Sequence, residues 1–239
     1  MFNEGHPQME SQVISKQRVA DHGEVLTGTR EVNAMLDLVR QETERIDSRF
    51  LEPACGTGNF LAPILERKLT VVEKRYAKDQ LEFERNAVLA VSSLYGIDIL
   101  ADNVSKCRER LFTVFDSFYD RLFSATSKAG CRDAVRHILM HNIVWGDALT
   151  YETCSKPSKP IVFPEWSFIQ GSLLKRRDFA FGGLVQHEET RESLLIPELI
   201  EKNVEQMSLF ADKHLDDFNP TPVHDYPPVH YLELAHVQQ

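Results

Sequence analysis

The stretch that decides the fold is Phe50-Leu-Glu-Pro-Ala-Cys-Gly-Thr-Gly-Asn-Phe60. Its first residues suit a short buried strand over 49–52, the run PACGTG is a tight turn, and helical spacing resumes over 59–67. Gly56 and Gly58 let the backbone pass close to a ligand, where a Cβ atom would collide with it. A strand, a glycine turn and a helix in this order predict a ligand-binding turn at the edge of a sheet.

Acidic residues end three predicted strands of the chain. Glu52 ends the first strand, Asp98 ends the strand Leu94-Tyr-Gly-Ile-Asp98, and Asp147 ends the strand Asn142-Ile-Val-Trp-Gly-Asp147. Each acid alone is more often a solvated loop residue, whereas three successive strand ends of this kind favour a binding site. We expect Glu52 to take the ammonium group of a zwitterionic ligand, Asp98 a ribose diol and Asp147 an adenine amino group.

The remaining apolar spacing predicts an alternation of strands and helices, which is typical of a parallel sheet with crossover helices. We therefore expect an α/β fold, with helices over 30–40, 72–94, 101–123 and 128–140.

After Asp147 the character of the sequence changes. Residues 161–181 are typical of a β-hairpin that carries the basic cluster Lys175-Arg-Arg177. This cluster either contacts phosphate or a partner, or forms a solvated hairpin face. The stretch 186–239 is acidic and rich in proline towards its end, with a helix expected over 196–210.

The composition limits the classes of protein that fit. The chain has 239 residues, 42% of them hydrophobic and 26% charged, as in a globular protein without a membrane span. The four cysteines are widely spaced, so we expect free thiols in a cytoplasmic protein, with no disulfide framework and no metal site. A formal net charge of −9 makes the chain by itself a poor candidate for binding DNA, because phosphate contacts need a basic face.

The same strand ends resemble motifs of the N6-adenine DNA methyltransferases. Residues 50–60 are similar to the first motif of that family, 95–99 to the second and 146–148 to the third. Upstream, His22-Gly-Glu-Val-Leu-Thr27 and the residues up to 36 resemble its N-terminal motif. The resemblance covers residues 18–150 and is greatest to methylase subunits and fused methylase regions of restriction-modification systems.

This resemblance implies a partial Rossmann-like fold that binds S-adenosylmethionine. It divides the chain into an N-terminal helical segment (1–48), a cofactor-binding core (49–150) and a hairpin with an irregular C-terminal extension (151–239). It implies that the threonine of the N-terminal motif contacts the cofactor carboxylate, although this chain has Gly28 where proline is usual. The cofactor-binding residues expected on this basis are Thr27, Glu52, Ala54, Gly56, Gly58, Asn59, Asp98, Ile99, Asp147 and Ala148.

The fourth motif of that family, Asn/Asp/Ser-Pro-Pro-aromatic, does not occur in this sequence. In the family its polar residue accepts hydrogen bonds from the target amine, and its ring stacks on the flipped base. The nearest stretch here is Phe163-Pro-Glu-Trp166, in which Phe163 offers no acceptor and Glu165 replaces the second proline. We therefore assign no catalytic residue and expect the isolated chain to be inactive.

Two explanations of the missing motif stay open. Either a companion or downstream polypeptide supplies the catalytic motif and target recognition, so that DNA is bound only by the assembled enzyme, or the chain is a degenerate methyltransferase kept as a cofactor-binding or regulatory subunit. A nucleotide-binding Rossmann protein is a third reading, which the absence of GxGxxG and of a Walker-type lysine disfavours.

Overall fold

The computed structural model describes residue 18 and the ranges 27–185 and 221–237. Its central feature is a four-stranded sheet in the order β1-β2-β3-β4. The first three strands are parallel, and the short β4 pairs antiparallel with β3. These strands are β1 (Phe50–Glu52), β2 (Leu94–Asp98), β3 (Ile143–Asp147) and β4 (Glu152–Thr153).

Helices fill the segments between the parallel strands, as expected. Between β1 and β2 lie α4 (Leu61–Tyr76) and α5 (Gln80–Ser92), and between β2 and β3 lie α6 (Ala101–Phe123) and α7 (Ala129–Asn142). Two further helices, α2 (Thr29–Leu38) and α3 (Arg40–Thr43), precede β1. The single helix predicted over 72–94 is wrong, because the chain turns between α4 and α5. Asp79 caps the second helix there, since its side chain accepts a hydrogen bond of 3.1 Å from the Glu82 N–H. The apolar stripe runs through both helices and hides this break.

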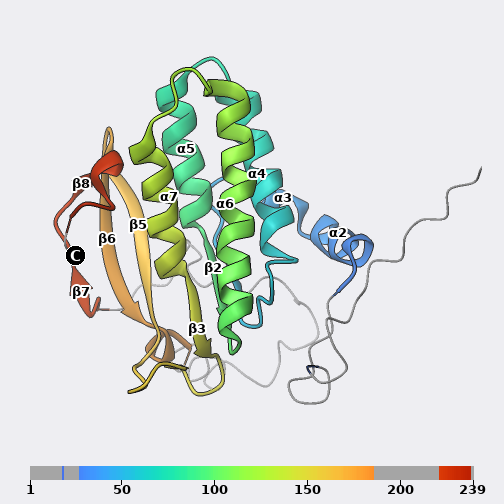
Figure 1. Cartoon of the computed structure of the whole chain (residues 1–239), viewed down its shortest axis with the longest axis vertical. Coiled ribbons are helices and arrows are strands. Elements are labelled where there is room, and N and C mark those ends of the chain that lie inside the picture. Colours follow the sequence, from blue (N-terminus) through green and yellow to red (C-terminus); the bar gives the residue numbers. More distant parts are fainter. Residues whose placement is uncertain (1–17, 19–26, 186–220, 238–239) are drawn as a thin grey trace, which may run out of the picture.

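Four helices, α4 to α7, lie side by side over one face of the parallel sheet (Figure 1). Both crossovers, from β1 to β2 and from β2 to β3, advance across the sheet in the same direction. Crossover connections share one handedness, so two that advance in the same direction place their helices on the same face. The opposite face must therefore be covered by something else.

The strands alternate between two apolar clusters, one on each face of the sheet. Phe50, Leu94 and Ile143 contact the cluster that includes α4 to α7. Leu51, Tyr95, Ile97 and Val144 contact a second cluster, whose other buried members are Ile161, Phe163 and Phe181. The two-residue period of a strand thus separates a helical side of the sheet from a side covered by the hairpin.

That hairpin consists of β5 (Val162–Gln170) and β6 (Leu173–Ala180), which confirms the hairpin predicted over 161–181. It continues past the sheet and packs beside α7 (Figure 1). The described part of the C-terminal extension is not irregular, because β7 (His224–Asp225) and β8 (Val229–His230) both pair with β6. The helix expected over 196–210 lies outside the described residues.

Two buried polar groups attach these late segments to the helices. The Asn142 side chain donates to the Ser92 and Leu94 carbonyls and accepts a 2.9 Å hydrogen bond from the Trp166 indole. In the 3₁₀ turn η1 (Tyr231–Glu233), the hydroxyl of the fully buried Tyr231 donates to the Glu84 carboxylate of α5. In the described ranges, no helix combines the length and the apolar character that a bilayer crossing requires.

Candidate functional site

The glycine turn after β1 adopts the backbone conformation that its sequence predicts. Gly56 has φ of 52° and Gly58 has φ of 84°, both in the left-handed region that favours glycine. At Gly58 a Cβ atom would also lie 3.0 Å from the Cys107 sulfur of α6. Gly58 is therefore required both by the backbone conformation and by the close packing of the turn on α6.

The three acidic strand ends lie at one edge of the sheet. Glu52 is paired in register with Gly96, Asp98 is paired with Trp145, and Asp147 is the last residue of β3. Because the strands are parallel, their carboxyl ends share this edge, which is where ligands bind in open α/β sheets. The backbone therefore brings the three predicted strand ends to the same edge of the sheet.

Glu52 is a half-buried carboxylate beside the turn. Burial raises its pKa, and a hydrogen bond from the Ala54 N–H acts in the opposite direction. Among the ion pairs of the described residues, none involves Glu52. A carboxylate in this position suits a cationic group of a ligand, because an ammonium would offset the cost of burying its charge.

Asp98 performs a structural task that the sequence does not reveal. One oxygen accepts a 2.8 Å hydrogen bond from the Gly56 N–H in the glycine turn. The other accepts from the Leu100 N–H at 2.8 Å and from the Asn103 amide at 3.3 Å. Only 9% of the residue is exposed. A carboxylate has about four acceptor positions, so roughly one stays open for a ligand hydroxyl.

An exposed apolar surface lies next to the acidic ends of β2 and β3. The Trp145 indole donates a 3.0 Å hydrogen bond to the Ile99 carbonyl, which joins the two strand ends. Ile99 is 45% exposed, Trp145 40% and Leu149 89%, and the Leu149 N–H donates to the Asp147 carboxylate at 2.8 Å. Apolar side chains beside hydrogen-bonding acids suit a flat heterocycle. Sequence reasoning selected Ile99 and missed Trp145 and Leu149, which stand beside the predicted acids.

The N-terminal segment reaches the site at Thr27. The Asn59 amide, just after the glycine turn, donates a 3.2 Å hydrogen bond to the Thr27 carbonyl. These two residues are 32 positions apart, so Thr27 lies beside the predicted first motif, whereas residues 22–26 of the predicted N-terminal motif lie outside the described residues. Ala54 is exposed in the turn, and Ala148 packs against the cluster on the hairpin side.

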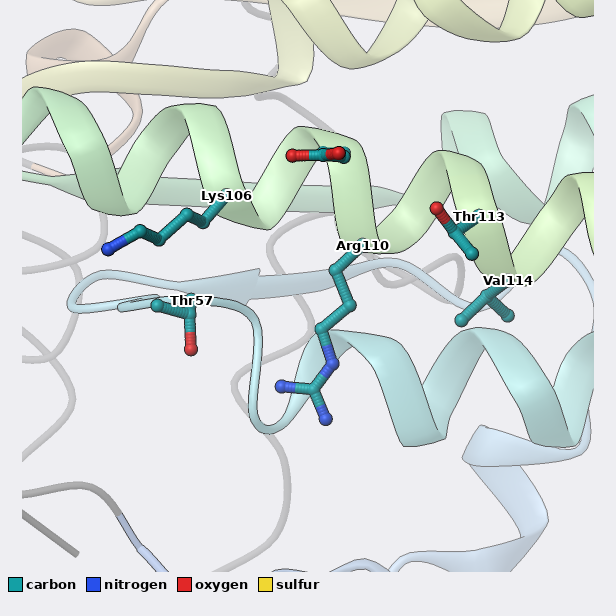
Figure 2. Close-up of a pocket in the computed structure, with 6 residues that line it drawn as sticks. Thr57, Lys106, Arg110, Thr113 and Val114 are labelled. Atoms are coloured by element: carbon teal, nitrogen blue, oxygen red, sulfur yellow. The ribbon is translucent and has the colours of Figure 1, made fainter. Parts of the chain in front are cut away.

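A cavity lies beside the glycine turn, between the turn and α6 (Figure 2). It is lined by Thr57, Lys106, Glu109, Arg110, Thr113 and Val114. None of the ten expected cofactor-binding residues lines it, and Thr57 is its only contribution from the turn. This cavity is a neighbour of the candidate site and not part of it.

The stretch Phe163-Pro-Glu-Trp166 has no free ring for stacking on a base. Phe163 is buried on the hairpin side of the sheet, and its ring contacts the Tyr95 ring edge-on. Trp166 is buried on the helical side, where its indole bonds to Asn142. Glu165 forms ion pairs with Arg49 and Arg177. Packing of the hairpin therefore accounts for these side chains.

The basic cluster on β6 is neutralised within the protein. Arg176 is buried and binds both carboxylate oxygens of Asp178, at 2.7 and 2.8 Å. Lys175 pairs with Asp225 at 2.9 Å, and Arg177 pairs with Glu165. Phosphate contact by this cluster is not supported, because each cation already has an acidic partner.

Cysteines and side chains of metal-ligating types also lie around the site. Three of the four cysteines are buried, and all four are free thiols. Within the described ranges, no three His, Cys, Asp or Glu side chains lie close enough to hold a metal ion.

A search for family models, curated proteins and solved structures similar to this chain found no match.

Proposed function

We propose that this chain is the S-adenosylmethionine-binding part of an N6-adenine DNA methyltransferase of the restriction-modification type. The observation that carries the proposal is the arrangement of Glu52, Asp98 and Asp147 at the carboxyl ends of three adjacent parallel strands, beside a left-handed glycine turn. The order β3-β2-β1 also equals the first half of the strand order in doubly wound nucleotide-binding sheets, in agreement with a partial Rossmann-like fold.

The side chains at this edge match the chemical groups of the cofactor. The half-buried Glu52 would hold the ammonium, and Thr27, brought close by Asn59, would contact the carboxylate. The remaining acceptor position of Asp98 suits a ribose hydroxyl, while Ile99 and Trp145 offer apolar surface to adenine next to Asp147. The cofactor itself supplies the methyl group.

Methyl transfer would require a further polypeptide. The described residues after Asp147 offer no side chain in the role of the family's fourth motif, since Phe163 and Trp166 are buried. A net charge of −9 and a neutralised basic cluster disfavour a grip on duplex DNA by this chain alone. We infer that a companion polypeptide supplies the amine acceptor, the stacking ring and target recognition, and that the assembled enzyme acts by positioning the adenine amine against the methyl group.

Titration calorimetry with S-adenosylhomocysteine tests the binding part of the proposal. Glu52→Gln should weaken binding about tenfold or more, because it removes a charge-assisted contact to the ammonium. Glu66→Gln, an exposed glutamate on α4, is the matched control and should bind like the parent. ATP and NAD lack the amino-acid part and should not compete. Displacement by ATP as efficient as by S-adenosylhomocysteine would instead identify a general nucleotide-binding protein.

Transfer of a labelled methyl group to mixed-sequence DNA tests the catalytic part. We expect no transfer by residues 1–239 alone and transfer once the polypeptide encoded downstream is added. Cofactor binding without transfer in either case would favour the degenerate, regulatory subunit. Turnover by the isolated chain would contradict the requirement for a partner.

A further inference from the structure

Arg110 of α6 is linked to the N-terminal side of the candidate site through one intermediate side chain. Its guanidinium donates a 2.7 Å hydrogen bond to the amide oxygen of Asn59. The amide nitrogen of Asn59 in turn donates to the Thr27 carbonyl at 3.2 Å. Figure 2 shows Arg110 extending from α6 across to the loop that precedes α4. Three separate segments are thus joined by two consecutive hydrogen bonds.

The charge of Arg110 selects one of the two orientations of the Asn59 amide. A guanidinium is a donor only, so it binds the amide oxygen and repels the amide NH₂ group. With its oxygen held by Arg110, Asn59 must present its NH₂ to the opposite side, where the Thr27 carbonyl accepts. Without Arg110 the amide oxygen loses this partner, so the Asn59 side chain is less restrained and its hydrogen bond to the Thr27 carbonyl is weakened.

This use of Arg110 differs from that of the other arginines of α6. Arg108 donates to the Ile143 and Met140 carbonyls at the end of α7, and Arg121 pairs with Glu73 of α4 at 3.0 Å. Those contacts hold the helices and the sheet together. The recorded contact of Arg110 in the described ranges is instead with the residue that follows the glycine turn.

Fixing the Thr27 carbonyl also fixes the start of α2. Thr27 directly precedes Gly28, the N-cap residue, whose carbonyl accepts a 3.0 Å hydrogen bond from the Val32 N–H. An anchor on Thr27 therefore orients the first turn of the helix. We propose that Arg110 is a positioning residue, which acts through Asn59 to hold Thr27 at the amino-acid end of the cofactor site. The cofactor part of this inference rests on the proposed function.

Hydrogen–deuterium exchange of the ligand-free protein tests the anchor without any ligand. Arg110→Ala should increase exchange in the peptide that begins at Thr27 and contains the first turn of α2. Asn59→Asp should have the same effect, because aspartate still accepts from Arg110 but cannot donate to Thr27. Arg110→Lys keeps a cationic donor and should restore part of the protection. Arg121→Ala, on the same helix, is the matched control and should leave this peptide unchanged.

Calorimetry with two ligands then tests the link to the cofactor site. Arg110→Ala should weaken the binding of S-adenosylhomocysteine about threefold to tenfold, because one contact that positions Thr27 is lost. Arg121→Ala should leave this affinity unchanged. The affinity for methylthioadenosine, which lacks the amino-acid part, should stay within about twofold of the parent. An equal loss for both ligands would show a general effect on the fold and would overturn the positioning role.

The two experiments fail independently. Unchanged exchange at Thr27 in both Arg110→Ala and Asn59→Asp would overturn the anchor, whatever the protein binds. If exchange increases in both variants but the parent protein binds neither ligand, the anchor stands and the proposed function is refuted instead.

Discussion

The carboxylate of Asp98 at the end of β2 holds the backbone of Gly56 in the glycine turn, through a hydrogen bond of 2.8 Å. An acid selected as a ligand for ribose therefore also shapes the turn on which the site is built. The two tasks use different acceptor positions of the same side chain, because Gly56, Leu100 and Asn103 occupy three of about four.

We accordingly expect Asp98→Ala to lower both stability and cofactor affinity. Three hydrogen bonds to a mostly buried carboxylate are lost, two of them from backbone N–H groups that are left without a partner, which costs about 2–4 kcal/mol. Urea denaturation and calorimetry with S-adenosylhomocysteine measure the two effects. A variant as stable as the parent would show that the turn holds its shape without Asp98.

Gly28→Pro should stabilise the protein. The N-cap glycine has φ of −67° and ψ of 154°, which proline adopts without strain, and its contact to Val32 uses the carbonyl and not the N–H. Proline restricts the unfolded chain, so we expect a gain of about 0.4–1 kcal/mol in urea denaturation. Gly171→Pro is the contrasting control, because φ of 53° at that hairpin turn is inaccessible to proline, and it should destabilise. Destabilisation by Gly28→Pro would show that the native contacts at this N-cap do not accept the proline ring or the loss of the N–H.

Strand ends and hairpin limits were predictable from the sequence because they depend on local signals. The short strand Phe50–Glu52 before the glycine turn and the acids that end β2 and β3 mark the edge of the sheet directly. The break between α4 and α5 was not predictable in this way, because the apolar stripe continues through it and only Asp79 marks the start of the second helix. Periodicity reports which face is buried and not whether the helix is continuous.

Long-range contacts of the site could not be predicted in the same way. The hydrogen bond between Arg110 and Asn59 joins residues 51 positions apart, and nothing near Arg110 in the sequence distinguishes it from its neighbours on α6.

The C-terminal segment was equally hard to predict from the sequence. Its prolines indicated an irregular tail, whereas Tyr231 is fully buried among the helices, because that tyrosine meets its partner only in the folded chain.

Tyr231→Phe should destabilise the protein by about 1–3 kcal/mol, since it removes one donor from a buried carboxylate. Burial of Glu84 opposes its ionisation, but hydrogen bonds from Lys128, Tyr119 and Tyr231 outweigh this effect and lower its pKa. Urea denaturation at neutral pH measures the loss. The matched control is Tyr226→Phe, whose hydroxyl lies 3.5 Å from Asp178, and it should change stability by less than about 0.5 kcal/mol. Equal effects of the two variants would contradict a special role for Tyr231.

Because of Lys68, the free energy of unfolding of the protein should rise as the pH increases above 7. Its ammonium is fully buried and donates to the Ile46 and Ser48 carbonyls and to the Ser93 hydroxyl, and burial lowers its pKa to about 7. Between this pKa and the value of about 10.4 for an unfolded lysine, only the unfolded state binds the proton, so stability rises with pH in that window. Below pH 7 both states are protonated and the contribution of Lys68 is constant.

Denaturation at pH 7, 8 and 9 tests this sign. The parent should gain up to roughly 1.4 kcal/mol per pH unit relative to Lys68→Met, which has no group to titrate at that position. Lys74→Met, at an exposed position on α4, should follow the parent. Parallel curves for the parent and Lys68→Met would show that the buried ammonium stays charged throughout.

The burial of Tyr231 against Glu84 also has a consequence for synthesis of the chain. The ribosome completes α5, α6 and α7 well before it adds the 3₁₀ turn that carries Tyr231. During that interval the Glu84 carboxylate lacks one of the donors that hold it in the helix layer. A nascent chain arrested before this turn therefore stays short of its final stability, which exposes it to chaperones and proteases. Translation must pass residue 231 before the helices reach their full packing.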